Sequence, residues 1–194
     1  MISLCAGYAS CDDLSARIKM GFQSKTAEYQ QLSNCCFTEA DIRCEKMTEV
    51  GKLAIKYFKA DCSCAQSVLK AVLEHKGISS EEFQYLAAGM GGGVAYQGNA
   101  CGAVTGGVLA IGALMSQFVI DVKEHKERTY RYSEEFVAHF KEEFGTILCK
   151  ELIGLDLSNS NDLEKGRSNG VFEKKCTRFV ERASILVSEL FSKQ

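Results

Sequence analysis

The chain of 194 residues contains no proline and no tryptophan. Because proline is the commonest helix breaker, its absence favours a helical fold. The chain also lacks a large excess of either charge: it has 23 Lys and Arg and 25 Asp and Glu, which gives a net charge of −2. This balance gives no electrostatic reason to expect a nucleic acid or an anionic membrane as partner. The first residues lack a basic stretch, so we expect no secretory signal and a cytoplasmic protein.

Cysteine, by contrast, is abundant, with ten residues in the chain. This is too few for a small secreted scaffold stapled by disulfides, and in a cytoplasmic protein it favours metal, cluster or thiol chemistry. The alternative is that buried cysteines act as small hydrophobic residues. Half of them lie near the start, so we expect a cysteine-containing extension over 1–45 and a helical domain over 46–194. The cysteines of the extension are Cys5, Cys11, Cys35, Cys36 and Cys44.

Apolar residues recur at helical spacing through most of the domain, and alternating runs typical of strands are missing. The sequence therefore predicts an all-α fold, a compact bundle of about six or seven helices. The segment 154–170 is polar and punctuated by glycine, which predicts a loop. The expected helices are 48–59, 64–75, 81–86, 100–120, 121–144, a short one that holds Cys149, and 171–191.

The segment between Phe83 and Ile120 carries no charged residue and no histidine, and it holds nine of the seventeen glycines. Its second half is long enough to be considered as a membrane span. The hydroxyl groups and the glycine-rich entry favour a buried central helix instead, and we expect no membrane partner. Small residues at Gly102, Gly106, Ala110 and Ala113 would allow close packing, either inside the chain or against a second copy in a homodimer.

Four cysteines share a position on or beside the apolar face of a different expected helix: Cys64, Cys101, Cys149 and Cys176. Four thiolates converging in a bundle could form a tetrahedral sulfur site for zinc or an iron–sulfur cluster. Their wide separation in the chain leaves open the alternative of four buried thiols that never meet. The neighbouring Cys62 forms a C-x-C pair with Cys64, which leaves open which of the two is the ligand.

Cys101 has the most specific surroundings of the four. Asn99 could cap the central helix, which would place Cys101 in its first turn, where backbone N–H groups lower the pKa of a thiol. The amides of Gly98, Asn99 and Gly102 could approach a bound anion such as a thiolate-ligated cluster. A turn needed only for tight helix packing explains the same glycines equally well.

Three motifs occur in order: Cys64-Ala65-Gln66-Ser67-Val68-Leu69, Gly89-Met90-Gly91-Gly92-Gly93 and Cys101-Gly102-Ala103-Val104-Thr105-Gly106. Together they resemble the C-GCAxxG-C-C family of redox-active proteins, with Cys149 and Cys176 matching its later cysteines. The resemblance runs from about Met47 to Phe191. It implies a redox function of the kind often found in anaerobes. A related module resembles the part of split-Soret cytochrome c that carries non-haem iron, which implies an iron–sulfur cluster.

Three hypotheses follow. The first is an electron-transfer or redox-sensing protein with an iron–sulfur cluster on Cys64, Cys101, Cys149 and Cys176. We prefer this hypothesis because it uses all four inward positions. Such a protein would act with a redox partner that the sequence does not identify. The second is a thiol–disulfide or sulfur-handling enzyme with Cys101 as a nucleophile of low pKa. The third is a helical protein with structural zinc on the same cysteines.

Overall fold

The computed structural model describes residues 39–78 and 81–192, with the backbone alone for 39–47 and for Glu81. The chain divides into two units, 1–46 and 47–194. The expected extension over 1–45, with its five cysteines, lies almost wholly outside the described residues.

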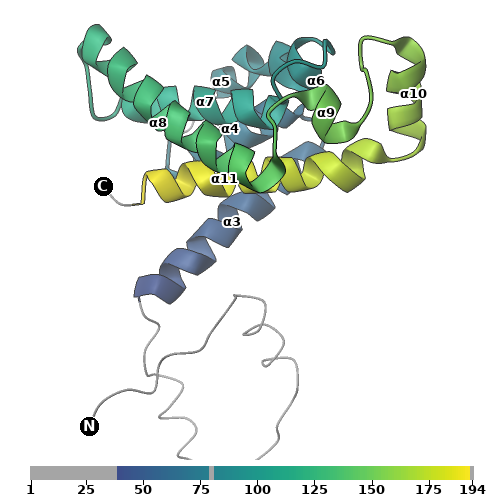
Figure 1. Cartoon of the computed structure of the whole chain (residues 1–194). Helices are drawn as coiled ribbons and strands as arrows, with labels where there is room; N and C mark the ends of the chain where they lie inside the picture. Colours follow the sequence, from purple (N-terminus) through teal and green to yellow (C-terminus); the bar gives the residue numbers. More distant parts are fainter. Residues whose placement is uncertain (1–38, 79–80, 193–194) are drawn as a thin grey trace, which may run out of the picture. The chain divides into compact units, whose positions relative to one another are not determined.

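The fold is all-α, as the sequence predicts (Figure 1). The described residues contain no strand, only a single antiparallel bridge between Ala100 and Leu148. A 3₁₀ helix covers Ala88–Met90 and a π-helix covers Phe172–Cys176. The α-helices are α3 (Glu39–Lys59), α4 (Cys64–His75), α5 (Glu81–Leu86), α6 (Gly91–Val94), α7 (Gly102–Met115), α8 (Val122–Phe144), α9 (Cys149–Ile153), α10 (Ser160–Ser168) and α11 (Thr177–Leu190).

Helix ends follow local chemistry at α4 and α8, and both helices match the predicted ranges. Ser63 and Gln66 form a reciprocal capping box that starts α4. The carboxylate of Asp121 accepts a hydrogen bond from the Glu124 amide at the start of α8. Gly145 ends α8 in the left-handed conformation with φ +81°, which glycine adopts without steric cost.

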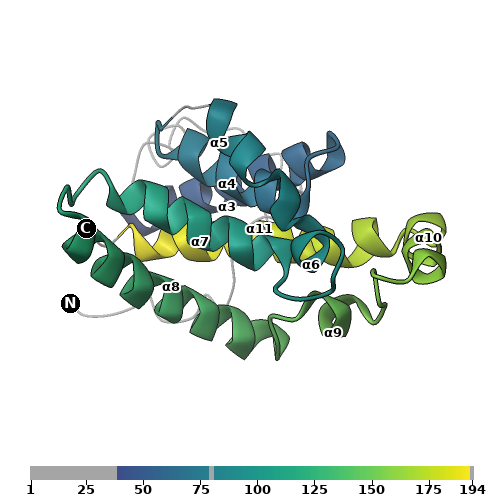
Figure 2. The ribbon, with the colours of Figure 1, turned by 90° about the horizontal axis from the view of Figure 1, so that it is seen from above.

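The central helix α7 lies between α4 and α8 (Figure 2). Its glycines let both neighbours approach: a Cβ at Gly106 would lie 2.5 Å from the Ala65 carbonyl oxygen, and one at Gly107 would lie 2.5 Å from Cζ of Phe136. The small-residue face at Gly106 is thus covered by α4 of the same chain. Close packing inside the chain is therefore what this face serves at Gly106, and the homodimer stays a prediction.

The central helix is also shorter than predicted. It ends at Met115, and Ile120 is 97% exposed rather than buried. The apolar run therefore continues past the point where packing against α4 and α8 ends. None of the described helices combines the length and the hydropathy that crossing a bilayer requires.

In the C-terminal third one prediction is wrong, and another is confirmed with a change in the type of its first helical turn. The expected loop over 154–170 contains α10, whose start is capped by the Asn159 side chain. The expected helix over 171–191 begins with one π-helical turn before α11. The rest of its apolar stripe is buried as predicted, because Phe179, Ala183 and Leu186 face the core.

Candidate functional site

Four different elements supply the predicted cysteines. Cys64 begins α4, Cys101 immediately precedes α7, Cys149 begins α9, and Cys176 ends the π-helix. Cys101, Cys149 and Cys176 are buried, and Cys64 is half-buried when the whole residue is considered. We call Cys64, Cys101, Cys149 and Cys176 the thiol cluster. Its members and Cys62 are all free cysteines.

Cys64 interacts with each of the other three members of the thiol cluster. The Cys176 thiol lies within hydrogen-bonding reach of the Cys64 sulfur, and this contact, with burial, raises the pKa of Cys64 well above its ordinary value. The charge of Cys64 in turn acts on two other members. It contributes, after burial, to a raised pKa at both Cys101 and Cys149, which reaches about 11 at Cys149. Three thiols therefore gather around Cys64.

The prediction of a low pKa at Cys101 is wrong. Burial raises its pKa well above the usual value, and the charges of Cys64 and Cys149 add to the rise. The backbone amides of Ala103 and Val104 act in the opposite sense, as expected at a helix start, but they do not prevail. Dehydration of a thiolate thus outweighs the favourable helix end.

Asn99 does not cap α7, because Cys101 itself occupies the N-cap position. Instead the backbone around Asn99 holds the two loops together. The Cys101 amide donates to the Ile147 carbonyl at 2.8 Å, and the Cys149 amide donates to the Asn99 carbonyl at 2.7 Å. The Gly98 carbonyl accepts from the Lys150 amide at 3.1 Å. This clamp fixes Cys101 beside Cys149, although the two are far apart in sequence.

Glycines give the cysteines room. A Cβ at Gly93 would lie 2.7 Å from Cβ of Cys149 and 2.6 Å from the Asn99 nitrogen. A Cβ at Gly102 would lie 2.9 Å from Cβ of Cys64. Real Cβ atoms do not come so close, so both positions require glycine for the thiol cluster to form. Gly102 thus packs against a predicted ligand.

A left-handed turn borders the thiol cluster. Gly92, Gly93, Val94, Ala95 and Tyr96 all have φ between +50° and +71°. Residues with a Cβ pay roughly 1–2 kcal/mol each for this conformation. Such strain persists only where the surroundings impose it, and it concentrates at functional sites. Here the Asn99 amide donates to the Gly93 carbonyl at 2.9 Å and so ties the turn to the clamp.

A cavity of about 640 Å³ opens beside the cysteines. Cys62, Cys64, Cys149 and Cys176 line it, whereas Cys101 is not part of its lining. The sequence indicated the cysteines but missed the other lining residues, and three of these lie in the segment 154–170 that was expected to be a loop. An Asn159 cap followed by Asp162 was the available signal for a helix there. The lining residues that were missed include Phe58, Tyr96, Ile153, Leu157, Leu163, Arg167 and Phe172.

The lysine Lys175 links two elements of the site. Its Nζ donates to the Ile153 carbonyl at the end of α9, at 2.8 Å. The π-helical turn that contains Lys175 adds a residue to the helix, and π-turns are frequent at functional sites. Through this bond, the elements that carry Cys149 and Cys176 are held together.

As the side chains stand, no three His, Cys, Asp or Glu residues of the described parts of the chain are in position to hold one metal ion. The thiols influence one another, but as they stand they do not form such a group. The site is therefore a largely buried group of free thiols beside a cavity.

The fold and the site together define a class of protein: a helical domain with a group of thiols beside a cavity. The model of the family described as "Putative redox-active protein (C_GCAxxG_C_C)" matches residues 62–190. The chain belongs to this family, as the sequence motifs indicate. No curated protein and no solved structure matches the chain.

Proposed function

We propose that this protein transfers or senses electrons through an iron–sulfur cluster held by Cys64, Cys101, Cys149 and Cys176. The observation that supports this most is the gathering of three thiols around Cys64 from three other elements. A two-thiol site would need only Cys64 and Cys176, and would leave the clamp that fixes Cys101 beside Cys149 without a purpose.

The donor set fits such a group in its chemistry. Iron–sulfur clusters are held by four thiolates, and they supply the storage of single electrons. Burial contributes to a raised pKa at Cys64, Cys101 and Cys149, so these thiols would lose their protons only beside a compensating positive charge. Their side chains would have to turn towards a shared centre.

Other parts of the chain would tune the site. The amides of Ala103 and Val104 face the Cys101 sulfur and favour its negative form. Amides near ligand sulfurs and exclusion of water both shift the potential of a bound cluster. The same residues thus serve the sulfur whether or not it carries a ligand.

The contact between Cys64 and Cys176 favours a second function, thiol–disulfide exchange. In this reaction the S–S bond between Cys64 and Cys176 would form as the S–S bond of a disulfide acceptor breaks, and the two protons and two electrons that the thiols give up would reduce the acceptor to two thiols. Cys64 and Cys176 fit this role better than Cys101, whose sulfur is not exposed on the cavity wall.

Purification without oxygen, followed by iron and sulfide analysis and visible absorption, tests the proposal. We expect a coloured protein with equal amounts of iron and sulfide. Single Cys→Ser variants at 64, 101, 149 and 176 should each lose the absorption, while the matched control Cys62→Ser keeps it.

Other outcomes separate the alternatives. A colourless chain that forms a Cys64–Cys176 disulfide on oxidation would replace the proposal with thiol–disulfide exchange. One equivalent of zinc, resistant to oxidation, would indicate a structural metal site instead. A coloured Cys101→Ser variant would remove Cys101 from the ligand set.

A further inference from the structure

The cavity has two kinds of wall. Cysteines supply one part, and the segment from α9 to the π-helix supplies apolar side chains. Its volume, about 640 Å³, falls in the range of about 300–1,000 Å³ usual for small-molecule sites. A metal group held by the thiols would need only the part of the lining that the cysteines supply. The apolar lining therefore calls for a second occupant. Its residues are Ile153, Leu157, Leu163 and Phe172.

Arg167 is the only cationic side chain in the lining of this cavity. It lies one helical turn after Leu163 on α10, so both residues share the face of α10 that borders the cavity. The ion pairs of the described residues use Arg128, Lys165, Arg178 and Arg182, but not Arg167. Arg167 is exposed, and its guanidinium is therefore accessible to a ligand at the cavity.

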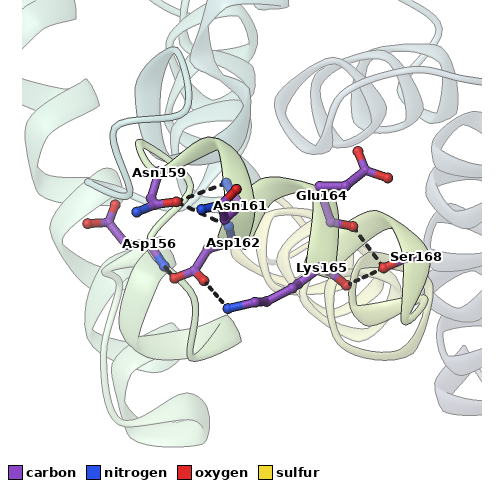
Figure 3. A network of polar contacts seen from close by, with 7 residues as sticks. All are labelled: Asp156, Asn159, Asn161, Asp162, Glu164, Lys165 and Ser168. Carbon is purple, nitrogen blue, oxygen red and sulfur yellow. Dashed lines mark hydrogen bonds and ion pairs between the residues drawn. The ribbon is translucent and has the colours of Figure 1, made fainter.

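Polar contacts away from the cavity hold α10 in place (Figure 3). The Asn159 side chain accepts hydrogen bonds from the amides of Asn161 and Asp162. Asp162 also pairs with Lys165 at 3.0 Å and accepts from the Asp156 amide at 3.4 Å. These contacts engage the neighbouring lysine and leave the cavity face of the helix to Leu163 and Arg167.

Close packing sets the position of Arg167 more firmly. The preceding residue, Gly166, is buried, and a Cβ there would lie 2.7 Å from Cζ of Phe172. Only glycine lets α10 approach the Phe172 ring this closely. Arg167 and the ring are therefore neighbours along one side of the cavity.

The other charged residue of the lining is Asp61, in the turn before Cys62. Its carboxylate repels an anion, whereas Arg167 attracts one. A negatively charged ligand would therefore point its charge towards α10 and away from the turn that carries Cys62.

We propose that the cavity binds a small organic anion, with its negative group on Arg167 and its apolar body against Leu163 and Phe172, beside the cysteines. The purpose of this site, presenting a redox substrate to the thiols, rests on the proposed function. The binding of the anion does not depend on the proposed function, because Arg167 and the apolar residues are not among the proposed cluster ligands. A guanidinium recognises a carboxylate or a sulfonate through paired charge-assisted hydrogen bonds.

Two fluorescent probes test the binding on the reduced full-length chain without oxygen. 8-Anilinonaphthalene-1-sulfonate carries one negative group, and N-phenyl-1-naphthylamine has the same ring system without it. We expect the anionic probe to bind about tenfold more tightly than the neutral one. Arg167→Gln should remove that preference, weakening the anionic probe about tenfold and leaving the neutral probe unchanged. The matched control is Arg178→Gln, whose arginine pairs with Glu143 and lines no part of the cavity, and which should change neither affinity.

Equal affinities for both probes, or equal losses in Arg167→Gln and Arg178→Gln, would overturn the proposal. Iron content of the same Arg167→Gln protein separates it from the proposed function. If that variant loses iron and keeps its preference for the anionic probe, Arg167 serves the metal group and the anion site is refuted. If the chain takes up no iron but the preference depends on Arg167, the anion site stands and the cluster fails.

Discussion

Two regions of this domain are built in opposite ways. The aromatic core, Phe136, Phe140, Phe144 and Phe179, joins two regular helices, α8 and α11, with ring centroids 4.6–6.4 Å apart. The thiol cluster joins helix starts, a strained turn and a π-turn. Large apolar rings on regular helices bury area without strain, whereas reactive groups from distant segments meet only where the backbone departs from regularity. Stability and chemistry are therefore largely separated in this molecule.

The largest expected effect tests the aromatic core. Phe140 is fully buried, and its ring contacts those of Phe136, Phe144 and Phe179. Phe140→Ala should lower the free energy of unfolding by about 3–5 kcal/mol, because it removes these contacts and leaves a hole. Denaturant unfolding measures the loss. The control Tyr130→Ala, on the same helix but 68% exposed, should change it by less than about 0.5 kcal/mol.

In the same Phe140→Ala protein, the reactivity of the cysteines towards a thiol reagent under native conditions should stay unchanged. A large increase before unfolding would show that the aromatic core also positions the thiol cluster, and the separation of the two regions would be wrong.

The next effect tests the tight packing of the thiol cluster. Gly93→Ala should lower the free energy of unfolding by about 2–4 kcal/mol, because its Cβ would strike Cys149 and the residue has φ +71°. It should also speed alkylation of Cys149, followed by mass spectrometry. Gly89→Ala is the matched control, since a Cβ there meets nothing within 4 Å and φ is not positive. Equal effects in both variants would contradict the role of Gly93.

A smaller effect of opposite sign tests the strain in the left-handed turn. Ala95→Gly should raise the free energy of unfolding by about 1 kcal/mol, because glycine adopts φ +50° freely. Ala88→Gly, in the 3₁₀ helix that precedes the left-handed turn, should lower stability by a similar amount. Thermal unfolding compares the two. Destabilisation by both substitutions would mean that the turn carries no strain.

The smallest effect concerns the link between α9 and the π-helix. Lys175→Met keeps most of the side-chain length but removes the hydrogen bond to the Ile153 carbonyl, and should cost about 0.5 kcal/mol. It should also increase the reactivity of Cys176. Lys174→Met is the control, because the Lys174 bond to the Asn169 carbonyl is exposed. A greater loss of stability in Lys174→Met than in Lys175→Met would contradict the role of Lys175 in linking α9 to the π-helix.

Much of the fold could be predicted from local patterns. The ranges of α4 and α8 follow from their caps and apolar spacing, as at Ser63, Asp121 and Gly145. The all-α class and the burial of Phe179, Ala183 and Leu186 follow from the same periodicity. These features depend on residues within a few positions of each other, which is the range over which a sequence pattern is readable.

The failures have a different cause. The extent of α7 depends on its packing against α4 and α8, and the place of α10 beside the Phe172 ring depends on the close approach at Gly166. The raised pKa of Cys101 depends on burial by distant segments, which outweighs its place at a helix start. None of these is a property of the residues next to the one concerned.

The sequence by itself determined the family and the all-α fold, and it predicted Cys64, Cys101, Cys149 and Cys176 as a group, because motif order and periodicity are written along the chain. Only the tertiary structure decided that Cys64 contacts Cys176, that Cys101 is held beside Cys149, and that Arg167 borders the same cavity. The physical reason is distance: contacts between remote segments arise from close packing at glycines and from backbone hydrogen bonds between loops, and no local pattern specifies them.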